Sequence, residues 1–327
     1  MLLPIRDVRA LRLSAPALPS WTSLLPGTVR TEKGQAGGDD WSLTTHGHWT
    51  LAKMSLPDAA RLNGSQLQHA VAATYLRLLT LLREHGDHQA VRFWNYLPGI
   101  LDHAGPSCDR YMIFNTGRHE ALSSWFGPPR LRQSLVAASA VDHGGDDFEV
   151  HVLATDATFR AIENPRQRPA HRYSQRYGPI PPSFARATVV EPLYPSDPLR
   201  LITAGTASVF GEDSRHRNDV RLQVEETFIN LAVLVAAASP AGTASGERVE
   251  QDVNVRRQLL SHCRHVRAYV TDARNEALVD RALRDMFANA QTIELMPAVL
   301  CRPDLLVEIE AFAEIETNES ATSDAEH

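Results

Sequence analysis

The segment CRPDLLVEIEAFAEI, residues 301–315, carries three glutamates whose spacing could serve chemistry. Read with a period of two, it predicts a strand with Glu308, Glu310 and Glu314 on one face and mainly apolar residues on the other. A glutamate acts as a general acid near neutral pH when burial raises its pKa from about 4.3 towards 6 or 7. On a half-buried strand, three such acids could also form an ordinary solvated face. Periodicity alone leaves both interpretations open.

A second candidate site is the segment 160–186, in which six arginines stand against a single acid, Glu163. Tyr173, Tyr177 and Phe184 are interleaved with these arginines. Because guanidinium groups bind carboxylates bidentately, the pattern predicts a pocket for a small ligand with more than one carboxylate. The alternative is a solvated loop. The six arginines are Arg160, Arg166, Arg168, Arg172, Arg176 and Arg186.

Other catalytic chemistries have little support in the sequence. Close histidine pairs occur, but none is accompanied by a third ligand at a spacing suited to a metal. There is no G-x-S-x-G nucleophile motif, and GTASVFG is neither a Walker loop nor a dinucleotide fingerprint. Because Lys33 and Lys53 are the chain's only lysines, a buried Schiff-base lysine has almost no candidate. We therefore expect no metal site and no cofactor.

The bulk composition narrows the class of protein. The chain of 327 residues is 43% hydrophobic, enough for the cores of about two domains, and its net charge is -6. An acidic protein lacks the positive field that holds nucleic acid or an anionic membrane, so neither is an expected partner. The N-terminus lacks a signal-peptide core, and the longest apolar run, residues 231–238, is too short to span a membrane. Cys108, Cys263 and Cys301 form no CxxC pair, so we expect a reduced, cytoplasmic protein.

Helices and strands alternate along the chain, which predicts a mixed α/β protein. We expect an irregular N-terminal lead-in over residues 1–40 and an α/β domain over 41–160. In that domain, a helix at about 65–85 has Ser65 as its expected N-cap, and residues 109–126 are expected to begin as a strand and turn helical at Gly117. The expected remainder is an Arg- and Pro-rich connecting segment at 161–197, a second α/β domain at 198–315 and a disordered acidic tail at 316–327.

Three segments of the second domain, VEETFINLAVLVAAA, HCRHVRAYVTD and LLVEIEAFAEI, follow one another in the order and spacing of one family. Residues 198–315 thereby resemble the RidA/YjgF family. The resemblance implies a RidA-like α/β fold for this half and places Glu308, the first glutamate of VEIE, in the lining of a pocket. Ile293 stands where that family has its carboxylate-binding arginine, which disfavours a plain RidA-type imine deaminase.

Longer motifs lie in both halves of the chain: VRFWNYLPGI, YMIFNTGR, ENPRQRPAHRYSQRYGP, PSFARA and AGTAS. Their order over about residues 90–310, together with Cys301 and Glu308, resembles that of the chorismatases. In that family a RidA-like C-terminal half follows an additional N-terminal half. The resemblance implies a cofactor-independent enzyme that cleaves the enolpyruvyl ether of chorismate, a dianion with two carboxylates.

The resemblance also implies how the substrate is held and cleaved. Glu308 would protonate the methylene carbon of the vinyl ether, with desolvation keeping its carboxyl group protonated. Arg118 and Arg186 would bind carboxylates. Tyr173 and Tyr111 would hydrogen-bond the ligand. Tyr96 and Arg172 are further candidates for substrate binding.

Two further positions bear on the product. The resemblance implies that Gly205 in AGTAS and Cys301 before the closing strand belong to the catalytic set and mark the subgroup that aromatises the ring. The expected products are pyruvate and 3-hydroxybenzoate, 4-hydroxybenzoate or both. Three alternatives remain: a hydrolase that releases a dihydroxycyclohexadiene carboxylate, a RidA-like imine deaminase, and a non-enzymatic protein that binds aromatic carboxylates. A monomer is the expected state of the chain.

Overall fold

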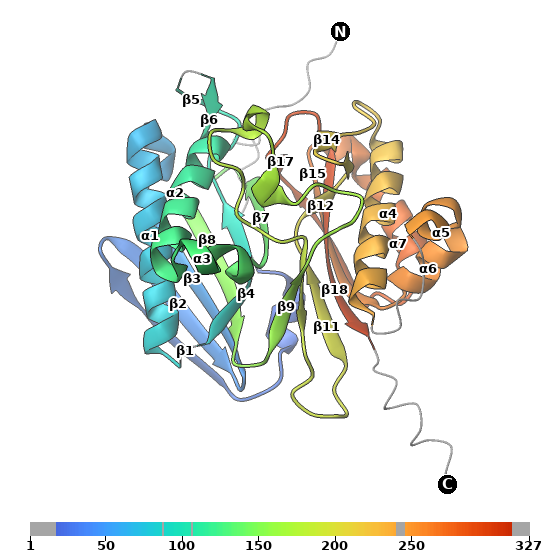
Figure 1. The fold of residues 1–327 in the computed structure, drawn as a ribbon, viewed down its shortest axis with the longest axis horizontal. Coiled ribbons are helices and arrows are strands. Elements are labelled where there is room, and N and C mark those ends of the chain that lie inside the picture. The colour runs from blue at the N-terminus through green and yellow to red at the C-terminus, as the bar shows by residue number, and fades with distance from the viewer. Residues whose placement is uncertain (1–17, 87, 106, 240–245, 316–327) are drawn as a thin grey trace.

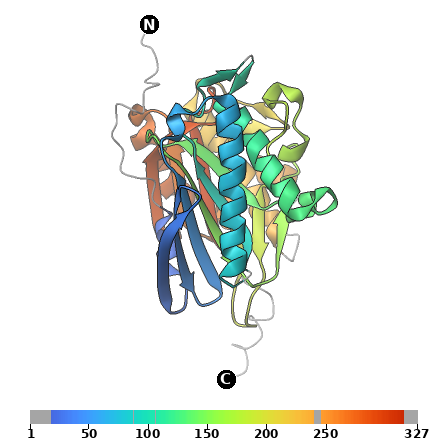
Figure 2. The same ribbon diagram turned by 90° about the vertical axis from the view of Figure 1, so that its left-hand side faces the viewer.

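The computed structural model describes residues 18–86, 88–105, 107–239 and 246–315. Two β-sheets lie next to each other in the middle of the molecule, and helices cover the outer face of each sheet (Figure 1). Figure 2, turned by 90°, shows two helices of the N-terminal half, α1 (Gly64–Glu84) and α2 (Arg110–Phe126), in front of the first sheet. The result is a four-layered molecule in which each sheet has one face towards helices and one towards the other sheet.

The first sheet has seven strands and is built mainly from the N-terminal half. In spatial order they are β1 (Val29–Ala36), β2 (Asp39–His46), β3 (Trp49–Leu56), β8 (Phe148–Thr155), β4 (Gln89–Tyr96), β7 (Ala137–Asp142) and β17 (Val299–Leu300). Neighbours are antiparallel except β4 and β7. Because β17 comes from the C-terminal half, the two halves share this sheet.

The second sheet has the closing strand near its centre. In spatial order its strands are β16 (Thr292–Pro297), β15 (Cys263–Val270), β18 (Val307–Ile315), β11 (Leu199–Thr203), β10 (Ala187–Val190) and β9 (Phe159–Ile162). The short β12 (Thr206–Ala207) also pairs with β18, so that Ala207 lies opposite Glu308. Two small ribbons complete the strands: β5 (His103–Gly105) with β6 (Cys108–Asp109), and β13 (Val209–Phe210) with β14 (Asp213–Ser214).

Local sequence signals account for the two helices on the first sheet. The N-cap of α1 is Asn63, not the predicted Ser65, and it forms a reciprocal capping box with Gln66. Helix α2 begins at Arg110, so the predicted strand before Gly117 is wrong. A Cβ at Gly117 would lie 2.3 Å from a carbonyl oxygen of α1, so glycine lets the two helices approach closely.

The remaining helices lie beside the second sheet or in connections. They are α3 (Pro128–Leu131), α4 (Val220–Ala238), α5 (Gly246–Gln251), α6 (Val253–Leu260) and α7 (Glu276–Met286). The apolar run at 231–238 is the buried end of α4, which packs against the second sheet. Among the described helices, none combines the length and apolar character needed to cross a bilayer.

Three hydrophobic cores correspond to the three contacts between layers. One joins the first sheet to α1 and α2, and another joins the second sheet to α4 and α7. The third lies between the sheets, where Trp49 and Trp94 of the first sheet meet Ile202, Tyr269 and Phe312 of the second. Strand β18 is therefore covered on both faces, and the predicted solvent-exposed face does not exist along most of its length.

Some of the predicted domain boundaries can be compared with the helices and strands of the structure. Residues 29–36, expected to be irregular, form the edge strand β1, and residues 1–17 lie outside the described residues. Strand β9 crosses the predicted boundary at 160/161 and joins the second sheet. The acidic tail at 316–327 also lies outside the described residues.

Candidate active site

A cavity of about 400 Å³ is lined by residues from both halves of the chain. Its wall combines α2, the loop that follows β9, the segment around β12 and the segment that leads into β18. Because these segments are distant in sequence, only the packing of the two halves brings them together. Seven of the predicted site residues line the cavity: Tyr111, Arg118, Tyr173, Arg186, Gly205, Cys301 and Glu308.

Glu308 is a buried acid in the wall of this cavity. It is 4% exposed, and its Oε1 atom has no hydrogen-bond partner among the described residues. Burial raises the pKa of Glu308 to about 8, and the charge of Glu310 adds to the effect. Arg92, Arg186 and Arg302 act in the opposite direction. At neutral pH the Glu308 carboxyl is therefore mainly protonated, as a general acid must be.

Glu310, on the same face of β18, is buried in a different environment. Its carboxylate accepts hydrogen bonds from Arg92 Nη2 at 2.7 Å, Trp94 Nε1 at 2.9 Å and Ser139 Oγ at 2.5 Å. These donors come from β4 and β7 of the first sheet, so the ion pair ties the two sheets together. A carboxylate that accepts hydrogen bonds from a cation and two further donors makes strong, charge-assisted contacts. Glu310 is therefore a structural anion next to the protonated Glu308.

Glu314, the third acid, lies near the end of β18. Its side chain is 34% exposed and pairs with Arg264 at 3.5 Å. The solvated-face interpretation thus describes Glu314, whereas it is wrong for Glu308 and Glu310. A strand that runs from the cavity towards the surface gives its three acids three different environments.

Gly205 leaves the space that the Glu308 carboxyl occupies. A Cβ atom at position 205 would lie 1.8 Å from Oε1 of Glu308 and 2.5 Å from its Cδ. Real Cβ atoms do not approach other heavy atoms so closely, so any larger residue would displace the carboxyl. Glycine at this position therefore determines where the buried acid points.

Three arginines of the cavity wall form no ion pair with an acid among the described residues. Arg118 is 2% and Arg186 is 6% exposed, and the Nε atom of each lacks a hydrogen-bond partner among the described residues. Arg302 lies over the ring of Tyr177, 4.1 Å from its centroid. None of the ion pairs between described residues includes any of these three arginines. Unpaired guanidinium groups in one cavity suit a ligand with more than one carboxylate.

Two tyrosines and a cysteine complete the polar wall. Arg186 donates a hydrogen bond to the hydroxyl of Tyr173, which orients the tyrosine towards the cavity. Tyr111 lies beside Cys301 and hydrogen-bonds its side chain. Burial raises the pKa of the Cys301 thiol to about 12, so Cys301 is a neutral thiol at physiological pH.

Two predicted site residues lie elsewhere, which corrects their assignment to the pocket. Tyr96 is buried between the sheets, where its hydroxyl accepts a hydrogen bond from Arg267 Nη1 at 3.4 Å. Burial raises the pKa of Tyr96 to about 12. Arg172 is exposed at the end of a short 3-10 turn and does not line the cavity. Only the residue type and the chain position of Tyr96 and Arg172 could be read from the sequence. Neither the burial of their side chains nor the direction in which these point could be predicted.

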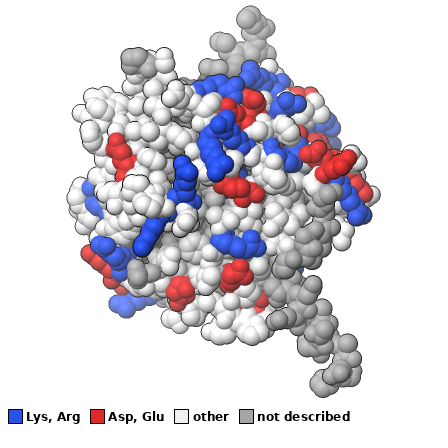
Figure 3. Space-filling model, viewed as in Figure 1, with Lys and Arg blue, Asp and Glu red and all other residues white. Residues whose placement is uncertain are grey.

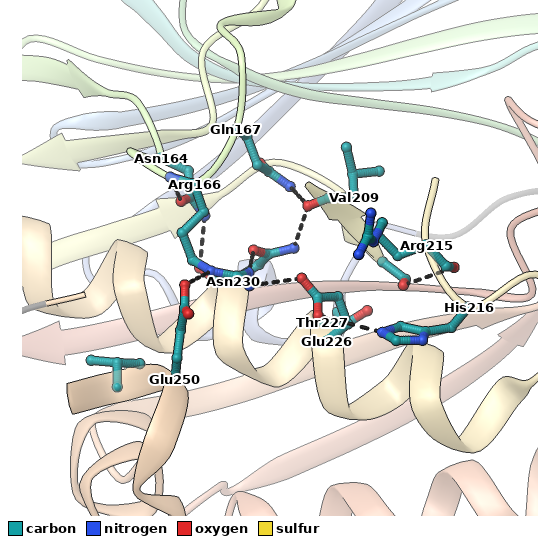
Figure 4. A network of polar contacts seen from close by, with 12 residues as sticks. Asn164, Arg166, Gln167, Val209, Arg215, His216, Glu226, Thr227, Asn230 and Glu250 are labelled. Carbon is teal, nitrogen blue, oxygen red and sulfur yellow. Dashed lines mark hydrogen bonds and ion pairs between the residues drawn. The ribbon is translucent and has the colours of Figure 1, made fainter. Parts of the chain in front are cut away.

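The loop after β9 is anchored to α4 by the network in Figure 4. Arg166 donates to the side-chain oxygen of Asn230 and forms ion pairs with Glu250 at 2.6 Å and Glu226 at 2.9 Å. Asn230 Nδ2 in turn donates to two carbonyl oxygens in the segment 207–209, each at 3.0 Å. The network holds the loop and the segment after Gly205 in fixed relative positions.

Glu212 holds the same loop further along the chain. Its carboxylate accepts hydrogen bonds from Ser174 Oγ at 2.7 Å and Ser174 N at 3.0 Å, and pairs with Arg168 at 3.2 Å and Arg176 at 3.3 Å. Its carbonyl oxygen accepts from Arg302 Nη1 at 2.8 Å. Figure 3 shows basic and acidic side chains mixed on this face of the molecule. Two exposed arginines of the loop, Arg168 and Arg176, are thus paired with acids, in contrast to Arg118, Arg186 and Arg302.

Asp109, Tyr177 and Arg302 are among the cavity residues that the sequence did not point to as site residues. Each is adjacent to or within a recognised motif: Asp109 precedes RYMIFNTGR, Tyr177 ends RYSQRY, and Arg302 follows Cys301. The position of these residues next to or within a motif was the only sign in the sequence that they could belong to the site. Such a position does not distinguish a side chain that lines the cavity from one that points away.

Comparisons with known proteins identify the family. Residues 24–154 match the family model of the N-terminal domain of FkbO/Hyg5-like chorismatases. A curated 3-hydroxybenzoate synthase from Streptomyces hygroscopicus is 31% identical over 247 residues, which are 74% of this chain and 68% of that protein. The chain belongs to the chorismatase family.

Further members agree with this assignment. A curated chorismatase from Streptomyces rapamycinicus is 29% identical over 280 residues, 85% of this chain and 78% of that protein. A chorismatase crystal structure that is 27% identical matches 86% of this chain and 79% of its own, with a TM-score of 0.70. The predicted family, its enzymatic nature and the mixed α/β fold are confirmed.

Proposed function

We propose that this chorismatase-family enzyme cleaves the enolpyruvyl ether of chorismate and releases pyruvate with 3-hydroxybenzoate, 4-hydroxybenzoate or both. The observation that carries the proposal is the buried carboxyl group of Glu308, whose pKa burial raises to about 8, in a cavity with three arginines that form no ion pair between described residues. A vinyl ether becomes labile when its terminal methylene carbon is protonated. One positioned carboxylic acid supplies that proton, and no metal is needed for the step.

The substrate is held by its two carboxylates. A cavity of about 400 Å³ is within the usual size range of small-molecule sites. Arg118 and Arg186 each offer a buried guanidinium group to one carboxylate, and Arg302 adds a third positive charge beside them. Fixing both carboxylates orients the methylene carbon relative to Glu308, and such positioning lowers the entropic part of the barrier.

The expected products follow from the proposed assignment to the subgroup that aromatises the ring. Chorismate has the same atoms as hydroxybenzoate plus pyruvate, so aromatisation consumes no net water. Gly205 and Cys301 lie on the cavity wall as that subgroup assignment requires. A curated relative named 3-hydroxybenzoate synthase adds support. A hydrolase of the same family would instead consume one water and release a dihydroxycyclohexadiene carboxylate.

Product analysis after incubation with chorismate tests the proposal. Purified protein in EDTA should release one pyruvate per chorismate, and chromatography should show hydroxybenzoate as the companion product. Absence of pyruvate would refute the proposal. A dominant dihydroxylated diene would refute the aromatising subgroup while keeping the cleavage step.

The substitution Gly205→Ala should displace the Glu308 carboxyl and lower kcat by about 10²-fold, since a shift of about 1 Å in a catalytic group has effects of that size. Steady-state pyruvate release measures the change. Gly246→Ala is a matched control, because a Cβ atom at position 246 meets no atom within 4 Å. Equal activity of G205A and wild type would contradict the proposed position of the acid.

The pH dependence of kcat/KM should follow the ionisation of the buried Glu308 carboxyl group. Because Glu308 must be protonated to act, kcat/KM should be constant at lower pH and fall about tenfold per pH unit above a pKa of about 8. Chorismate itself remains a dianion throughout this range. A pH profile of the initial rate of pyruvate release measures this decrease. A rate that instead rises with pH above 8 would show that Glu308 acts as a base.

A further inference from the structure

A second cavity, of about 150 Å³, lies in the N-terminal half of the chain. Its wall is formed by the C-terminal parts of α1 and α2, the beginning of β4 and the segment 133–136 that leads into β7. Both helices lie over the outer face of the first sheet (Figure 2). Among the described residues, Arg118 alone belongs to the walls of both cavities. The cleavage of chorismate leaves this second cavity without a role.

The wall of the second cavity is largely apolar. Leu82, Phe93 and Leu122 are buried in it, and Trp125 and Phe126 contribute half-buried aromatic rings. An apolar cavity of about 150 Å³ is large enough for one benzene ring. The space therefore suits a small aromatic ligand.

The charge of the wall is positive. Arg118 is 2% exposed, its Nε atom has no hydrogen-bond partner among the described residues, and its guanidinium carbon lies 5.4 Å from the ring centroid of Phe93. Arg83 is exposed and lies over the ring of Trp125, 4.6 Å from the centroid. Neither arginine takes part in an ion pair between described residues, and no aspartate or glutamate is among the wall residues described. Two such guanidinium groups around an apolar space favour an aromatic ligand that carries a carboxylate.

We propose that the second cavity binds a small aromatic carboxylate, with the carboxylate on Arg118 and the ring among the apolar side chains. Hydroxybenzoate belongs to this class of ligand, so inhibition by the enzyme's own product follows, and that consequence rests on the function proposed above. Because Arg118 is also proposed to bind a carboxylate of chorismate, the two ligands compete for one guanidinium group. Occupation of the second cavity should raise KM for chorismate and leave kcat unchanged, and chorismate should weaken the second ligand by the same factor.

Binding is tested with benzoate as the probe and tryptophan fluorescence as the signal. Trp125 lies in the cavity wall, so benzoate should change the emission of wild-type protein in a saturable way. Trp125→Phe should lose most of this change and still bind benzoate in calorimetric titration. Absence of saturable binding to wild type would show that the cavity is only a gap in the packing, and a full emission change in W125F would place benzoate elsewhere.

Ala90→Leu tests the location, because Ala90 belongs to the wall of the second cavity and a larger side chain there fills part of the space. The affinity for benzoate should fall about tenfold or more. Ala72→Leu is the matched control, since Ala72 packs against the same hydrophobic core but lies outside both cavity walls. Its affinity for benzoate should equal that of wild type, and circular dichroism confirms that both variants are folded.

Steady-state kinetics test the link between the two cavities. Benzoate should raise KM for chorismate in wild type, A72L and W125F, with a much smaller rise in A90L. An equal rise in A90L would mean that benzoate occupies the candidate active site, which would overturn the proposal. Failure of the proposed function is distinguishable from this outcome, because fluorescence and calorimetry measure benzoate binding without turnover.

Discussion

Replacing Glu308 with glutamine should lower kcat for chorismate cleavage by about 10²–10⁴-fold, the usual contribution of a general acid. Glutamine keeps the shape of the side chain but cannot donate a proton of comparable acidity to carbon. The arginines that hold the substrate are unaffected, so substrate affinity should change only a few-fold. Pyruvate release measures the rate, and calorimetric titration of E308Q with chorismate measures the affinity.

Glu314→Gln is the matched control for this change. It alters an acid on the same strand and the same face, six residues further along the chain, where the side chain is 34% exposed. Its activity should equal that of wild type. Near-normal turnover by E308Q would show that Glu308 is not the proton donor. An equal loss in both variants would show that removal of a strand carboxylate, and not loss of the proton donor, explains the effect.

Arg92→Met should be the most destabilising of the substitutions considered, with a loss of about 3–5 kcal/mol in the free energy of unfolding. Arg92 and Glu310 form an ion pair with side chains 1% and 7% exposed, at 2.7 Å between Nη2 and Oε1. Methionine fills similar space but leaves the Glu310 carboxylate buried without its cation. Denaturant titration followed by circular dichroism measures the loss.

The exposed ion pair between Arg264 of β15 and Glu314 of β18 serves as the comparison for the buried pair. Arg264→Met removes the partner of Glu314, where both side chains are about one-third exposed, so the expected loss is below about 1 kcal/mol. The double variant R92M/E310Q should recover part of the loss in R92M, because the unpaired charge is then removed. A loss below about 1 kcal/mol in R92M would contradict the account of Glu310 as the anion that joins the sheets.

Periodicity predicted which residues of the closing strand share a face, but not what covers that face. The apolar face of β18 packs against α4, as an alternating strand predicts. The acidic face meets a second sheet built from the other half of the chain, and no local signal in the segment 307–315 contains that partner. The three glutamates of β18 therefore look equivalent in the sequence pattern, whereas the environments of their side chains differ in the structure.

The local elements were easier to predict than the site. Helix α1 follows from the apolar spacing of its residues, although its N-cap is Asn63 and not Ser65. Resemblance to the family pointed to seven residues that line the cavity, because long motifs fix their order along the chain. It did not distinguish Tyr96, which points between the sheets, from residues that line the cavity. The direction of a side chain depends on tertiary packing, which a motif does not contain.

The steric role of Gly205 could not be predicted from its sequence context. A glycine in AGTAS is compatible with a kink, a phosphate loop or a turn. The structure shows a different reason, since the space of its missing Cβ atom is taken by the Glu308 carboxyl. A contact between residues 103 positions apart requires the register of β12 against β18.

The proposed mechanism depends on the protonation state of Glu308, and infrared difference spectroscopy of wild type against E308Q measures it directly. We expect a protonated-carboxyl stretch at neutral pH that is absent from E308Q and disappears with a midpoint near pH 8. If the difference spectrum instead shows an ionised Glu308 throughout the range from pH 6 upwards, the proposed proton donor does not exist.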